Sequence, residues 1–130
     1  LMDTGGNCGS QSATLVIRGL ALEEIRPRDV GRVVRKELAV ALIVSAILAA
    51  ANGLRIFLQY HDAAIALVIS LSLVATVILS KLVGCVLPIA ARQLRMDPAI
   101  MASPLITTIV DAGAVLIYFQ AATAFLPLSV

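Results

Sequence analysis

The sequence has few charged residues, and they are unevenly distributed. Only 14% of its 130 residues are charged and 60% are hydrophobic, whereas an average soluble domain has about 25% charged residues. Residues 38–54 and 63–80 contain no charge, and residues 99–130 contain a single one. Apolar runs of about 18 or more residues match the thickness of a bilayer core. Three such runs leave too little polar chain to cover them in water, so we predict a membrane protein.

The residues that most enzymes need are scarce. The single histidine, His61, stands in a predicted loop, and the sequence has no HExxH zinc motif. Ser10 and Ser103 have no histidine at a matching depth, and an aspartyl protease would need a second buried acid. Cys8 and Cys85 have neither metal-ligand spacing nor a disulfide framework, and we expect free, buried thiols. We therefore predict that the chain is not an enzyme.

Glycine and proline divide the chain into helices. Residues 1–9 are rich in glycine, without a charged leader, and are predicted to be irregular, followed by a half-helix over residues 10–22. Full spans are expected over residues 38–59, 63–87 and 97–126, with Pro88 ending or kinking the second. The predicted fold is an all-α polytopic transmembrane helix bundle, three full spans plus an N-terminal half-helix, as one domain over residues 1–130. Since a half-helix cannot cross a bilayer alone, we expect further membrane helices upstream.

The positions of the cations predict the orientation. Lysine and arginine collect around residues 23–37 and 88–97, whereas the turn at 59–62 has only Arg55 nearby. Such residues accumulate in short cytoplasmic loops. We therefore expect a multi-pass protein of the cell membrane, with the lipid bilayer as a partner, both basic segments in the cytoplasm, and the turn at 59–62 and the C-terminus outside. The net charge of +2 gives no reason to expect a nucleic-acid partner.

Asp111 is the one acidic residue expected deep within a span. An ionisable side chain at the bilayer centre costs about 2.5–3.5 kcal/mol, and such residues usually face a bundle interior or a water-filled path. Thr107 and Thr108 lie on the same helical face. One hypothesis is an ion path past Asp111. The alternative is a neutral or paired aspartate that holds helices together, with Lys81 as its partner.

A depth estimate relates Asp111 to the glycine-rich segment. Ser10 and Asp111 each lie roughly 20 Å from the predicted cytoplasmic boundary at about 1.5 Å per residue. Irregular backbone at this depth would offer carbonyl oxygens, and Asn7 and Gln11 would add side-chain oxygens. Mg²⁺ prefers oxygen ligands and loses its water reluctantly. Few carboxylates combined with carbonyls, amides and retained water would therefore suit this ion.

Two stretches resemble the MgtE family of magnesium transporters. They are GGNCGSQSATLVIRGLALEEI and MDPAIMASPLITTIVDAGAVLIYF, and the intervening PIAARQLRMDPA agrees as well. The resemblance covers essentially the whole chain, from the end of the second family membrane helix to the fifth. It implies a homodimer with five membrane helices per subunit and a pore along the dimer axis. It also implies cytosolic regulatory domains, including a pair of CBS modules, that precede the membrane part.

The resemblance further implies which residues would meet the metal ion. These are Asp111, Thr107, Asn7, Ser10 and Thr14, and many family members have asparagine where this chain has Ser10. The expected function is the passage of hydrated Mg²⁺, the transported ion, across the membrane past Asp111. The alternatives left open are transport of another divalent cation, Mn²⁺ or Co²⁺, and a structural subunit of a membrane complex. The residues do not separate a channel from a coupled carrier.

Overall fold

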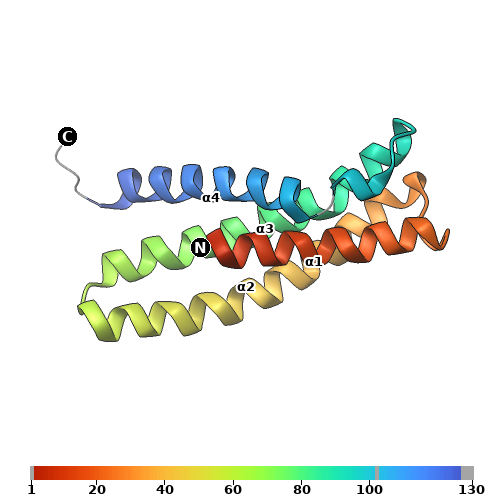
Figure 1. The fold of residues 1–130 in the computed structure, drawn as a ribbon. Helices are drawn as coiled ribbons and strands as arrows, with labels where there is room; N and C mark the ends of the chain where they lie inside the picture. The colour runs from red at the N-terminus through yellow and green to blue at the C-terminus, as the bar shows by residue number, and fades with distance from the viewer. Residues whose placement is uncertain (1, 102, 127–130) are drawn as a thin grey trace.

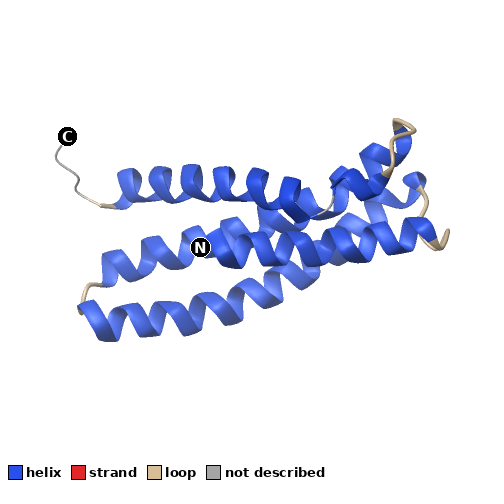
Figure 2. Ribbon diagram, viewed as in Figure 1, coloured by secondary structure: helices blue, strands red, loops and turns tan. Residues whose placement is uncertain are grey.

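A computed structural model of the chain describes residues 2–101 and 103–126. Its elements are α1 (Met2–Ala21), the 3-10 turn η1 (Pro27–Asp29), α2 (Val30–Tyr60), α3 (Ala63–Gln93), the 3-10 turn η2 (Pro98–Met101) and α4 (Ser103–Phe125). Every regular element of the described part is helical (Figure 2). The predicted all-α class is confirmed. Leu1 of the N-terminal segment and residues 127–130 of the predicted outer end lie outside the described residues.

Three segments of the described chain are long and apolar enough to cross a membrane. They are Pro27–Tyr60, Ala63–Gln93 and Pro104–Phe125, and they correspond to the three predicted spans. α3 packs against α1, α2 and α4, and α1 also packs against α4. The turn between α2 and α3 lies at one end of the bundle, and the two basic connections lie at the other (Figure 1). α1 begins partway along the bundle and therefore covers only part of its length.

The prediction that residues 1–9 are irregular is wrong, because α1 is continuous from Met2. The glycines allow α1 to lie directly on its neighbours. A Cβ placed on Gly5 would lie 2.7 Å from Thr76 Cγ2, and one placed on Gly9 would lie 3.2 Å from the backbone oxygen of Ser80. Close packing of this kind overrides the weak helix propensity of glycine.

The predicted helix boundaries also need correction. α2 begins at Val30, which agrees with our expectation that residues 30–37 form the basic first turns of that helix, whereas α3 passes through Pro88 to Gln93, so residues 88–93 are helical. The proline removes one helical hydrogen bond. Beyond it, Ile89 packs in a buried cluster with Val16, Leu20 and Cys85, and this burial favours continuation of the helix. The last span begins with the turn η2 and continues as α4 from Ser103, where the following proline suits a first helical turn.

The close approach of α1 to α3 can be tested by a substitution at Gly84. A Cβ at Gly84 would overlap the carbonyl oxygen of Gly9. Gly84→Ala should therefore lower the melting temperature in detergent, since overpacking typically costs about 1–3 kcal/mol. Gly31 is the matched control, because a Cβ there meets nothing within 4 Å and alanine favours a helix. Gly31→Ala should leave the melting temperature unchanged or raise it. Equal melting temperatures for the two variants would contradict this packing.

Candidate ion path between α1 and α4

Asp111 lies on α4 and faces the glycine-rich half of α1. A Cβ placed on Gly6 would lie 3.7 Å from Asp111 Oδ1 and 3.7 Å from Thr107 Oγ1. The residue is half-buried, and its Oδ1 is enclosed without a hydrogen-bond partner in the described part of the chain. The carboxylate and the glycine segment are therefore neighbours, although this segment is helical and its backbone carbonyls are not freed by a break.

Ser10 and Thr107 meet one helical turn away from Asp111. Their hydroxyl oxygens are 3.4 Å apart, and Thr14 donates a hydrogen bond to the carbonyl oxygen of Ser10 at 2.8 Å. Asn7, Ser10 and Thr14 share a face of α1 by their spacing, and the side chains of Asn7 and Thr14 are exposed. The depth estimate placed Ser10 at the level of Asp111. In the structure α1 and α4 run antiparallel, and Ser10 lies beside Thr107, one turn before Asp111.

Two cavities lie along α1, one on each side of Gly6 in the sequence. One has a volume of about 480 Å³ and is lined by Ser10, Gln11, Thr14 and Leu15. The other has a volume of about 370 Å³ and is lined by Met2, Asp3, Ala114, Val115 and Tyr118. The second cavity therefore lies between α1 and α4, whereas the first is an open hollow lined by α1 alone.

Asp3 is a residue of this face that sequence reasoning missed. Its side chain is exposed and lines the second cavity. Residues 3, 7, 10 and 14 follow the spacing of one helical face. This spacing was the available signal, and the interpretation of residues 1–9 as irregular concealed it.

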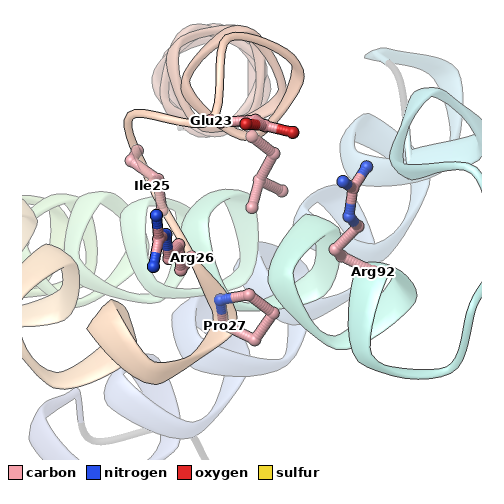
Figure 3. A pocket seen from close by; sticks show the side chains of 6 residues that line it. Glu23, Ile25, Arg26, Pro27 and Arg92 are labelled. Atoms are coloured by element: carbon pink, nitrogen blue, oxygen red, sulfur yellow. The ribbon is translucent and has the colours of Figure 1, made fainter.

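A further cavity lies at the basic end of the bundle and contains none of the predicted site residues. Its volume is about 280 Å³, and its lining includes Glu23, Arg26 and Arg92 (Figure 3). These charged residues come from the connection after α1 and from the last turn of α3. The cavity therefore belongs to the arginine-rich end used to predict orientation, and it is separate from the site of Asp111.

A buried ion pair between α2 and α3 was also not predicted from the sequence. Lys81 Nζ lies 3.4 Å from Glu37 Oε2, and the two side chains are only 8% and 11% exposed. Ser12 of α1 donates a hydrogen bond to the same Glu37 oxygen at 2.7 Å. Lys81 is thus the partner of Glu37, so the alternative that pairs it with Asp111 is wrong. Glu37, which was expected in the cytoplasmic segment 23–37, is buried within α2, so Asp111 is not the one acid enclosed by the helices.

Asp111 is the carboxylate beside Gly6, and the surrounding donors are hydroxyl and amide groups. Cys8 and Cys85 are free and buried, as predicted. No three histidine, cysteine, aspartate or glutamate side chains gather into a metal-binding group within residues 2–101 and 103–126. The polar side chains of α1 and α4 named above are hydroxyls, amides and the carboxylates of Asp3 and Asp111, and hard cations prefer oxygen ligands of these kinds.

The fold and this face together define a polytopic helical membrane protein in which polar side chains, including the carboxylate of Asp111, lie between α1 and α4. Comparison with known families then identifies the chain. It belongs to the MgtE family, whose model carries the description "divalent cation transporter" and matches residues 1–121.

Curated relatives agree with this assignment. The chain is 39% identical over 126 residues to the magnesium transporter MgtE of Thermus thermophilus, covering 97% of this chain and 28% of the relative. It is 36% identical over 121 residues to the magnesium transporter MgtE of Bacillus subtilis, covering 93% of this chain and 27% of the relative. The magnesium transporter MgtE of Enterococcus faecalis is 29% identical over 123 residues, covering 95% of this chain and 27% of that relative. The chain thus spans little more than a quarter of the length of these relatives.

The contact between Ser10 and Thr107 can be tested by a disulfide. With Cys8 and Cys85 replaced by alanine, Ser10→Cys and Thr107→Cys should crosslink rapidly under mild oxidation, because their hydroxyl oxygens are 3.4 Å apart and a disulfide needs only a small adjustment. Mass spectrometry of the peptides linked within one chain measures the yield. Ser10→Cys combined with Thr123→Cys is the control, since Thr123 lies roughly 24 Å further along α4. Equal yields from the two pairs would contradict the placement of α1 on α4.

Proposed function

We propose that the face between α1 and α4 is the wall of a path along which hydrated Mg²⁺ crosses the membrane. The observation that carries the proposal is the position of Asp111, whose enclosed Oδ1 has no hydrogen-bond partner in the described part of the chain. A buried charge without a partner is costly. A passing cation with its water supplies the missing partner, and this gives a reason for a carboxylate at this position.

The residues on either side of Asp111 extend the path along the helices. Thr107 and Ser10 present hydroxyl oxygens one turn toward the basic end, and the exposed Asn7 and Thr14 continue this polar stripe on α1. Asp3 would attract cations from the opposite side. In our proposal these groups contact the water shell of the ion and do not replace it, because Mg²⁺ sheds its inner water reluctantly. Weak binding of this kind lets the ion leave.

The polar side chains of Asn7 and Thr14 are left open by the four helices. In our proposal a second copy of the chain covers this face, so that the path follows the axis of a homodimer and receives Asp111 from each subunit. The arginine-rich end of the bundle would face the cytoplasm, as its charge favours. Regulation would come from cytosolic domains of the full-length protein. The printed names of the relatives, all magnesium transporters, support the choice of ion.

The driving force would be the electrochemical gradient. Moving one elementary charge through 100 mV changes the free energy by about 2.3 kcal/mol, and a divalent ion gains about twice that amount on inward movement. The protein then has to lower the barrier without holding the ion tightly. Asp111 with neutral oxygen donors beside it, and Asp3 further along the face, satisfy both requirements.

Asp111→Asn tests this proposal directly. Mg²⁺ uptake into proteoliposomes containing the protein in its natural full length should fall by at least about tenfold. Charges of +2 and −1 about 4 Å apart attract by about 2 kcal/mol even at the dielectric constant of water, and the amide removes this attraction. Uptake of Mn²⁺ and Co²⁺ in the same vesicles would show how far the loss depends on the ion.

The matched control is Asp62→Asn at the exposed turn between α2 and α3. Asp62 caps α3 by accepting hydrogen bonds from the amides of Ala64 and Ile65, and asparagine can also act as a cap. Asp62→Asn should therefore retain wild-type uptake. Wild-type uptake by Asp111→Asn would remove Asp111 from the ion path and would favour a purely structural role.

A further inference from the structure

Three polar side chains from three different helices meet behind the proposed path. Ser12 of α1 is fully buried and donates its hydrogen bond to Glu37 of α2 at 2.7 Å. Glu37 is paired with Lys81 of α3 at 3.4 Å. Opposite charges cancel within this group, so it adds little net charge to the interior. None of the three residues belongs to the polar stripe that faces Asp111.

The other contacts of α1 with α3 are mostly steric and apolar. Gly9 and Gly84 bring the two backbones together, and a Cβ on Gly84 would meet the Gly9 carbonyl. Small residues allow such close approach, and Val16 and Leu20 of α1 pack with Cys85 and Ile89 of α3 in a buried apolar cluster. Ser80 adds one hydrogen bond to the carbonyl oxygen of Gly5. Apolar burial is non-directional, so directed polar contacts add specificity to the register that this packing allows.

Ser12 is well placed to set the rotation of α1. At about 100° per residue it points away from Ser10, which is two positions earlier. Ser12 contacts α2 through Glu37, whereas Ser10 contacts Thr107 of α4. Any rotation that breaks the Ser12 hydrogen bond also moves Ser10 and Gly6 relative to Thr107 and Asp111.

We propose that Ser12, Glu37 and Lys81 form a positioning clamp that holds the polar stripe of α1 in register with Asp111. The clamp touches no ion and acts through the orientation of α1. Its effect on ion passage rests on the function proposed above, while its effect on helix geometry does not. Buried polar groups of this kind can contribute specificity of arrangement more than stability, and the clamp is such a case.

The first test separates positioning from folding. Ser12→Ala removes one small hydroxyl and should still fold. In the natural full-length protein, reconstituted at equal amounts of folded protein, it should raise the half-saturating Mg²⁺ concentration by roughly tenfold, the lower end of the effect expected for the loss of one buried hydrogen bond to a charged group. Ser45→Ala is the control. Ser45 is equally buried, but its hydroxyl bonds to Leu42 within its own helix, so the half-saturating concentration should stay at the wild-type value.

The second test measures helix geometry without transport. In the background without native cysteines, Ser12→Ala should slow disulfide formation between Ser10→Cys and Thr107→Cys several-fold, and Glu37→Gln should do the same. When Glu37→Leu and Lys81→Met together replace the pair by apolar residues, Ser12→Ala should cause no further slowing. The effects of the two changes on the crosslinking rate should not add, because Ser12 acts through Glu37.

The outcomes distinguish the clamp from the proposed function. If Asp111→Asn keeps wild-type uptake while Ser12→Ala slows crosslinking, the proposed function fails and the clamp stands. If Asp111→Asn loses uptake but Ser12→Ala changes neither the half-saturating concentration nor the crosslinking rate, the clamp is overturned. A Ser12→Ala effect confined to the yield of folded protein would also overturn it, because that is the result of a merely structural role.

Discussion

The arrangement depends on the direct contact between the backbones of α1 and α3. The Gly9 carbonyl lies where a side chain on Gly84 would be, so neither helix can carry a larger residue there. This approach allows α1 to sit between α3 and α4 and brings Gly6 beside Asp111. The close approach at these two glycines therefore allows a carboxylate and a polar helix face to lie against each other.

The spans could be predicted from the sequence because they depend mainly on composition. Charge-free runs bounded by polar turns gave three membrane-length helices, and the described helices agree with them. Their ends were less predictable. α3 continues through Pro88 to Gln93, because burial of Ile89 and its neighbours depends on tertiary contacts that no local signal reveals. The glycine-rich start of α1 is helical for the same reason.

The polar residues, like the helix ends, were only partly predictable from the sequence. Asp111 stood out because it interrupts an apolar run, and its neighbours on α1 came from the resemblance to the MgtE family. Asp3 was hidden by the irregular interpretation of its segment. Glu37 was hidden because it follows Arg35 and Lys36 and so looked like part of the basic cytoplasmic segment 23–37. Its burial against Lys81 arises from the pairing of α2 with α3, which spacing along the chain does not encode.

The central claim is that position 111 faces a wet passage, and chemical accessibility measures this most directly. In the protein without native cysteines, Asp111→Cys should react with a small, water-soluble cationic thiol reagent, and Mg²⁺ should slow the reaction. Val110→Cys is the neighbouring control, because Val110 is fully buried, and it should remain unreactive. If the cysteine at position 111 were as unreactive as the one at position 110, with and without Mg²⁺, the side chain would lie in a helix contact without water. That result would contradict the proposed ion path past Asp111.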